Sequence, residues 1–141
     1  MKTAIVILNW NGKKLLEQFL PSIVNFSNIN NVTIYIADNA STDDSIAFVQ
    51  KTFPTVKIVE NKKNGGYAKG YNDALKNVTE DLLVLLNNDV EVTQNWLQPI
   101  INEFKRDDSL IAAQPKILDF NKSSQCDGNF GVKFGLSSIF T

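Results

Sequence analysis

Apolar runs recur along the chain, separated by longer stretches in which apolar residues return only every third or fourth position. The first run is continuous and rich in β-branched residues, which is typical of a strand buried on both faces. Similar runs follow, each bounded by polar or glycine-containing segments. The pattern predicts strands at residues 3–8, 32–37, 56–59, 81–86 and 111–114.

The stretches between these runs have the spacing of amphipathic helices. The first predicted helix contains Pro21, which is expected to bend it or to remove one backbone hydrogen bond. A second helix is expected after residues 41–44, whose short polar side chains are typical N-caps. Two more are predicted, one after the glycine pair at 65–66 and one over 96–104.

This alternation of strands and helices predicts the class of fold. Connections of this length favour an α/β fold with a mostly parallel sheet and helices on both of its faces. The fourth run, residues 81–86, is the most apolar and is predicted to be a central strand. From about Asp119 onward the periodicity fades into glycine, serine, asparagine and isolated phenylalanine.

The composition excludes several classes of enzyme. The chain has 141 residues, the length of one domain, with no histidine and a single cysteine. It cannot form a Ser–His or Cys–His nucleophile, a histidine-ligated zinc site or an imidazole general base. Any chemistry must rest on carboxylates, amides, hydroxyls, lysines or a metal held by oxygen atoms.

Charge and cysteine content indicate which partners and which cellular compartment to expect. A net charge of −1 argues against nucleic acid as a partner, since the basic excess that binds phosphate is absent. A single cysteine fits a reducing compartment. The apolar run at the N-terminus is too short for a signal peptide or a membrane span. We therefore expect a cytoplasmic location, with association at the inner face of the membrane only through regions outside this sequence.

Short polar residues and glycines follow each of the first four predicted strands. They occupy residues 9–12, 38–41, 61–66 and 87–91. Asparagine, aspartate and glycine favour turns, so any one of these loops has an ordinary structural explanation. In an open parallel sheet, however, ligands bind beyond the carboxyl ends of the strands, and four such loops at one edge favour a binding site.

The loop after the fourth strand carries two carboxylates, Asp89 and Glu91. A carboxylate placed directly after a buried strand is held rigidly and can bind a hard divalent cation together with phosphate oxygens. If the strand continues, residues two apart share a face, and the two side chains could act together. A solvated acidic turn is the alternative interpretation.

The glycine pair at Gly65 and Gly66 opens a predicted helix, whose N-terminus can bind phosphate. Lys62, Lys63 and Lys69 add positive charge nearby. The segment matches neither the dinucleotide-binding glycine pattern nor the P-loop pattern, so neither of those nucleotide sites is supported.

Taken together, these residues resemble the family 2 glycosyltransferases with the GT-A fold, a Rossmann-like architecture, and especially their rhamnosyltransferase-like branch. The resemblance covers residues 4 to about 114. It rests on four motifs in the order and spacing of the family: IVILNWNG at 5–12, ADNASTD at 37–43, NGGYAKGYN at 64–72 and LLNND at 85–89.

The resemblance implies a site for a nucleotide-sugar donor such as a UDP- or dTDP-sugar. Asp38 would accept a hydrogen bond from the ring N–H of uracil or thymine. The other residues implied to contact the nucleotide are Asn9, Asn11, Gly12, Asn39 and Asn88, the last of which would face the ribose.

The resemblance also implies a metal ion. Asp89 would hold the Mg²⁺ or Mn²⁺ that bridges the donor diphosphate, and Glu91 is a second candidate ligand. The pair Asn88–Asp89 is similar to the D-x-D element of the family but keeps only one strong carboxylate. The residues implied to lie near the donor phosphates or sugar are Gly65, Gly66 and Lys69.

Members of the family invert the anomeric centre with an Asp or Glu base that lies beyond the fifth strand. The only carboxylates after Gln114 are Asp119 and Asp127, and neither belongs to an acidic pair. Asp127 is therefore a candidate base, but we expect the base after Thr141. On this interpretation residues 1–118 form the donor-binding core and 119–141 an incomplete start of the acceptor region, a truncated segment that is inactive alone.

The predicted function is metal-assisted transfer of a sugar, with inversion, to a saccharide or lipid-linked acceptor in polysaccharide biosynthesis. The alternative is a catalytically silent module that binds a nucleotide or nucleotide sugar without transferring it. A phospho-acceptor receiver domain is disfavoured, since no acidic residue follows the first strand.

Overall fold

The structure is a computed structural model, and it describes residues 1–115. The chain divides into two compact units, one from Met1 to Gln94 and one that begins at Asn95. The boundary predicted at 118/119 lies outside the described residues.

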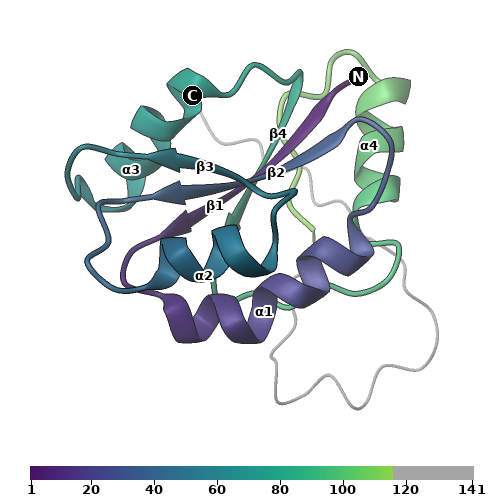
Figure 1. Cartoon of the computed structure of the whole chain (residues 1–141). Coiled ribbons are helices and arrows are strands. Elements are labelled where there is room, and N and C mark those ends of the chain that lie inside the picture. The colour runs from purple at the N-terminus through teal and green to yellow at the C-terminus, as the bar shows by residue number, and fades with distance from the viewer. Residues whose placement is uncertain (116–141) are drawn as a thin grey trace. The chain divides into compact units, whose positions relative to one another are not determined.

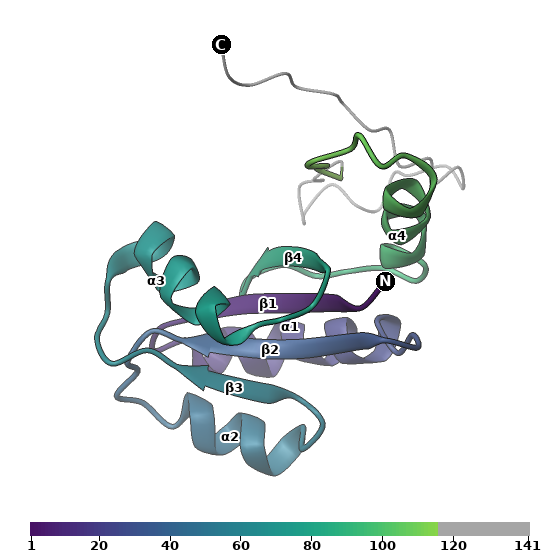
Figure 2. The same cartoon turned by 90° about the horizontal axis from the view of Figure 1, so that it is seen from above.

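The first unit is built on a four-stranded parallel sheet. Figure 2 shows the strands side by side in the order β3-β2-β1-β4. Each lies close to the position predicted from the apolar runs, with bounds β1 Thr3–Asn9, β2 Val32–Asp38, β3 Lys57–Glu60 and β4 Leu82–Asn87.

Three helices pack on this sheet, on both of its faces (Figure 1). Their bounds are α1 Lys13–Phe26, α2 Ser45–Thr52 and α3 Gly66–Ala74, the last continued by a short 3₁₀ turn, η1, at Leu75–Asn77. Helix α1 runs through Pro21 without interruption, and the missing N–H of the proline leaves one backbone bond unmade. The predicted α/β fold, a parallel sheet with helices on both faces, is therefore confirmed.

The strand β1 lies inside the sheet and is buried on both faces because its side chains alternate between them. Ala4 and Val6 pack with Tyr71 and Ala74 of α3 in one apolar cluster. Ile5, on the opposite face, is fully buried. The continuous apolar run of β1 thus serves two cores at once.

Two predictions about the sheet are wrong. The strand β4 is the most apolar, but it lies at an edge of the described sheet rather than in the centre. Leu83 and Leu85 on its α3-side face are 41% and 49% exposed, because the buried strand residues of the apolar cluster at α3 come from β1 and β2. Residues 111–114 form no strand, since Ile111 is 95% exposed and no described strand pairs with this segment.

In the second unit, the predicted fourth helix is present as α4, Leu97–Arg106. Its buried side chains are Leu97, Ile100 and Ile101, at the spacing that predicted it. Within residues 1–115, no helix is long and apolar enough to cross a membrane.

Candidate functional site

The ends of the strands lie in register at the carboxyl edge of the sheet. Asn9 pairs with Asp38, and Asp38 pairs with Glu60. On the other side of β1, Leu8 pairs with Asn87. The four polar loops therefore begin side by side, as expected for a parallel sheet.

Asn9, the last residue of β1, is fully buried. Its amide nitrogen lies 3.2 Å from Asp38 Oδ1, 3.2 Å from Ser41 Oγ and 3.0 Å from Ser45 Oγ, and donates hydrogen bonds to them. Its Oδ1 accepts from Asn88 Nδ2 at 3.2 Å. One uncharged side chain thus joins the loop after β2, the start of α2 and the loop after β4.

Asp38, the last residue of β2, is only 3% exposed. Its Oδ1 accepts from the Asn9 amide, and its Oδ2 accepts from the backbone N–H of Ser41 at 2.9 Å. Each carboxylate oxygen can accept two hydrogen bonds, so acceptor capacity remains. The role of Asp38 in reading the base stays a prediction, with its carboxylate held from two sides.

Asn11 ties the loop after β1 to the loop after β2. Its backbone N–H donates to Ser41 Oγ at 2.9 Å, and its Oδ1 accepts from the N–H groups of Thr42 and Asp43 at 2.7 and 3.3 Å. Its φ of 49° is a left-handed conformation that asparagine tolerates better than most residues. The two loops therefore form one connected surface.

Gly12 is packed against the amide pair formed by Asn9 and Asn88. A Cβ at this position would lie 2.4 Å from Asn9 Oδ1 and 2.4 Å from Asn88 Nδ2. Any larger side chain would displace one of the two amides, so the site requires glycine here.

The carboxylate of Asp43 links the first turns of α1 and α2. It accepts from the backbone N–H of Lys13 at 3.1 Å and from both the N–H and the hydroxyl of Ser45. Burial disfavours its charged form, but these hydrogen bonds outweigh burial and lower the pKa of Asp43. Within the segment 41–44 predicted to cap α2, Asp44 occupies the N-cap position without a capping hydrogen bond from its side chain, and Asp43 supplies the acceptor.

The predicted metal ligands lie beyond the end of β4. The strand stops at Asn87 and a turn follows, so the expectation that Asp89 and Glu91 share a strand face fails. Both carboxylates are exposed, and Asp89 forms no hydrogen bond or ion pair with the described residues. Within residues 1–115, no cluster of three or more acidic or cysteine ligands is present. The metal assignment stays a prediction.

Asn39 follows Asp38 but is turned toward the loop after β3, and it is 3% exposed. The groups that its side-chain amide meets belong to Asn61, Asn64, Gly65 and Gly66. The residue that the sequence assigns to the nucleotide therefore faces the loop that leads into α3.

The start of α3 carries the residues predicted to lie near phosphate. Gly66 has a φ of 79°, which favours glycine. Lys69 packs against Gly65, and its Nζ donates to Asp73 Oδ2 at 2.6 Å. With a second ammonium from Lys76 at 2.7 Å, the pKa of Asp73 falls to about 2. Lys69 thus reaches along α3 away from its N-terminus, and its role at the phosphates stays a prediction.

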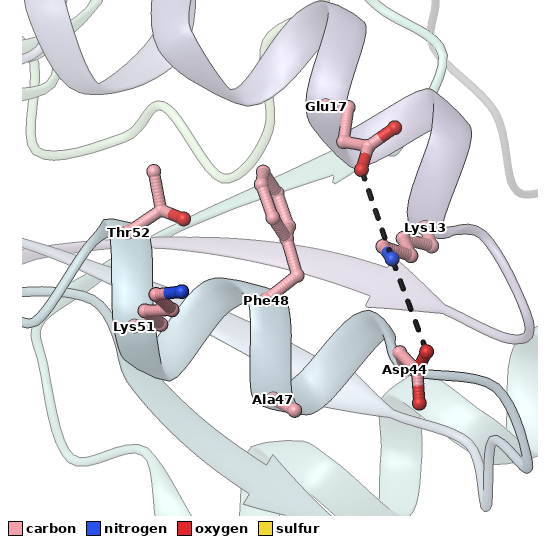
Figure 3. A pocket seen from close by; sticks show the side chains of 7 residues that line it. All are labelled: Lys13, Glu17, Asp44, Ala47, Phe48, Lys51 and Thr52. Carbon is pink, nitrogen blue, oxygen red and sulfur yellow. Dashed lines mark ion pairs between the residues drawn. The ribbon is translucent and has the colours of Figure 1, made fainter.

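A separate groove of about 370 Å³ lies between α1 and α2 (Figure 3). At one end, Lys13 Nζ lies 4.0 Å from Glu17 Oε1 and 3.9 Å from Asp44 Oδ2. None of the residues predicted to bind nucleotide or metal lines this groove.

The structure also brings in residues that the sequence pattern does not single out as functional. Ser45 is fully buried and bonds to Asn9, although from the sequence it is only the residue after a polar run. Asn61 and Asn64 bond to Asn39, and their clustering with glycine after a strand is the one available signal. The candidate base Asp127 lies outside the described residues.

Comparison with known proteins gives one family. Residues 4–127 match the model of the family Glycosyl transferase family 2. An uncharacterized glycosyltransferase from Bacillus subtilis, YfnE, is 26% identical over 79% of this chain and 29% of its own length. An uncharacterized glycosyltransferase from Haemophilus influenzae is 21% identical over 97% of this chain and 42% of its own length. The chain thus spans less than half the length of these relatives.

Solved structures show the same fold. Residues 1–349 of S. aureus TarS in complex with UDP-GlcNAc superpose with a TM-score of 0.66 at 21% identity, over 75% of this chain and 32% of that one. The mannosyltransferase PcManGT from Pyrobaculum calidifontis, in complex with GDP-Man and Mn²⁺, superposes with a TM-score of 0.65 at 21% identity and the same coverage.

Proposed function

Because the chain belongs to glycosyl transferase family 2, we propose that it forms the nucleotide-sugar-binding part of an inverting, metal-assisted glycosyltransferase. The observation that carries the proposal is the set of hydrogen bonds that joins the loops at the carboxyl edge of the sheet. There the buried Asn9 connects Asp38, the proposed base-reading carboxylate, to Asn88, the neighbour of the proposed metal ligand Asp89. Residues from three strands thus converge where an open parallel sheet binds its ligands.

On the nucleoside side, the rigid hold on Asp38 supports its role. Because Asn9 and Ser41 already hold the carboxylate in place, it loses little conformational entropy when it binds a ring N–H of uracil or thymine. The exposed Asn11 and the glycine at position 12 border the same surface. We assign base and ribose to this end of the edge, with Asn88 toward the ribose.

On the phosphate side, the residues present fit a hard divalent cation. Such an ion keeps several water ligands and takes phosphate oxygens, so it needs only one or two protein carboxylates. Asp89 is exposed and without a partner among the described residues, and Glu91 is close in sequence. When bound, Mg²⁺ or Mn²⁺ would neutralise charge on the departing nucleoside diphosphate.

The donor and acceptor follow from the family and its structural neighbours. TarS and PcManGT form complexes with UDP-GlcNAc and with GDP-Man and Mn²⁺, which supports a nucleoside diphosphate sugar as donor class. We propose a uridine or thymidine diphosphate sugar, and a saccharide or lipid-linked acceptor on the cytoplasmic side in polysaccharide biosynthesis. A rhamnosyltransferase-like specificity is the finer form of the proposal.

Calorimetric titration with UDP, dTDP and GDP, each with and without Mn²⁺, tests the donor site. We expect Asp89→Ala to abolish the metal-dependent part of binding and Asp38→Ala to weaken binding with or without metal. Asp81→Ala is the matched control, because Asp81 is an exposed carboxylate before β4, at the amino edge of the sheet.

Absence of binding of every nucleotide by folded protein would refute the proposal. Unchanged binding by both the Asp38 and the Asp89 variant would refute the site assignment. Transfer assays on a longer protein that contains this chain separate the enzyme from the silent module, which binds donor without passing the sugar to an acceptor.

A further inference from the structure

We infer that Asn39 is a positioning residue, which holds the loop 61–66 and the start of α3 in place for the donor diphosphate without touching the nucleotide itself. The inference rests on the proposed function and changes the role that the sequence motif assigns to this side chain. It links the nucleoside end of the site to the phosphate end.

The first argument is that the hydrogen-bonding capacity of Asn39 is used up. An asparagine side chain has two N–H donors and an oxygen with two lone pairs. Nδ2 donates to Asn64 Oδ1 at 2.8 Å and to the carbonyl oxygen of Gly66 at 3.2 Å. Oδ1 accepts from Asn61 Nδ2 at 3.3 Å and from the N–H of Gly65 at 3.4 Å. No donor or acceptor is left for a ligand.

The second argument is burial. Asn39 is 3% exposed and is packed beneath α3, since a Cβ on Gly70 would lie 3.0 Å from Asn39 Nδ2. Its backbone N–H donates to the carbonyl oxygen of Asn9 at 2.8 Å, which fixes it to the end of β1. A rigid strand end therefore carries the side chain that grips the loop.

The third argument concerns the backbone N–H groups at the start of α3. The first N–H groups of a helix have no partner within the helix. Asn39 and Asn64 accept from those of Gly65 and Gly66, respectively. The N–H groups of the next residues in the first turn of α3 remain for an anion, and their direction depends on the loop that Asn39 holds.

A comparison of nucleoside diphosphate with monophosphate tests the role. The probes are UDP and UMP, or GDP and GMP if the guanine nucleotide binds more tightly, each with Mn²⁺. For Asn39→Ala we expect the affinity for the diphosphate to fall about tenfold and that for the monophosphate to change by less than about twofold. A direct contact with the base or ribose would instead weaken both ligands equally, and that result would overturn the inference.

Asn64→Ala gives a second variant at an exposed position, useful if Asn39→Ala folds poorly. If both residues act through the same loop, the double variant loses little more diphosphate affinity than Asn39→Ala alone. Additive losses would contradict a shared role. Ile23→Val, a buried change in the last turn of α1, controls for general loss of stability.

Amide hydrogen exchange supplies a readout without nucleotide. We expect faster exchange at Gly65 and Gly66 in Asn39→Ala and no change there in Ile23→Val. Unchanged exchange at these glycines would overturn the inference about Asn39 and leave the proposed function standing. Failure of the wild-type protein to bind any nucleotide, with faster exchange in the variant, would refute the proposed function and leave the grip on the loop intact.

Discussion

At the scale of single residues, the carboxyl edge of the sheet is organised by amides. Asn9 and Asn39 are both almost completely buried, yet each bonds to several neighbours. A buried amide avoids the desolvation cost of a buried charge and can donate and accept at the same time. Two uncharged side chains therefore connect the loops and leave the charged Asp89 exposed to solvent.

The first prediction concerns Gly12. In Gly12→Ala the new Cβ collides with the amides of Asn9 and Asn88, at 2.4 Å from each contacting atom. We expect a loss of about 1–3 kcal/mol in the free energy of unfolding, because Asn9 is held in place by its bonds to Asp38, Ser41 and Ser45. Urea denaturation measures the loss, and titration with UDP and Mn²⁺ should show weaker binding.

The matched control is Gly65→Ala. Gly12 and Gly65 both occupy N-cap positions, before α1 and α3. A Cβ on Gly65 would lie 2.8 Å from Lys69 Cγ and 3.1 Å from Lys69 Cβ, and a change of the Lys69 rotamer relieves the closer of these contacts. Equal destabilisation by both substitutions would show that the amide pair does not set the requirement for glycine at position 12.

At the scale of elements, the loops stabilise one another more than they stabilise themselves. The start of α1 receives its acceptor from Asp43, which lies just before α2. The loop after β1 in turn supplies Asn11 to the N–H groups before α2. Neither helix start is capped by its own N-cap side chain, so the two helices depend on their joint placement beside β1 and β2.

The second prediction concerns the attachment of α3 to the sheet. The buried hydroxyl of Tyr71 donates to the carbonyl oxygen of Leu86 at 2.8 Å, and burial raises its pKa, so it stays protonated. Tyr71→Phe should lower the free energy of unfolding by about 1 kcal/mol, the net contribution of one hydrogen bond. Chemical denaturation checks this value.

Tyr67→Phe is its control on the same helix. Tyr67 is 64% exposed and donates to Asn87 Oδ1 at 3.0 Å, where water can replace the bond. We expect a loss below about 0.5 kcal/mol. A larger effect at Tyr67 than at Tyr71 would contradict the view that α3 is fixed to the sheet through its buried face.

At the scale of the whole molecule, binding and stability are linked. The proposed site is formed by the loops after all four strands, so the ligand binds the folded protein and not the unfolded chain. A nucleotide present at one hundred times its dissociation constant, with Mn²⁺, should raise the free energy of unfolding by about 2.7 kcal/mol. Thermal and urea unfolding with and without ligand measure this; Asp38→Ala should show a smaller rise at the same nucleotide concentration. An equal rise in that variant would place the ligand elsewhere.

Much of the architecture was predictable because its signals are local. The first four apolar runs predicted strands close to their observed bounds, and helical spacing predicted α1 to α4. No local signal in the sequence gives the positions of β3 and β4 in the sheet. High apolar content suggested a central position for β4, but Leu83 and Leu85 are exposed at an edge of the sheet formed by the described residues. The apolar content of a strand shows that its side chains prefer apolar contacts. Which strands lie beside it is set by the path of the chain.

The sequence by itself determined the alternation of strands and helices, the absence of histidine from these 141 residues and the four polar loops that carry the family resemblance. These follow from residue type and spacing, which act over a few positions. Only the tertiary structure decided which polar atoms meet. It turned Asn39 toward the loop after β3 and Lys69 toward Asp73, and it buried Ser45 beside Asn9. Such partners depend on strand register and helix packing, and those bring together residues that are distant in the chain.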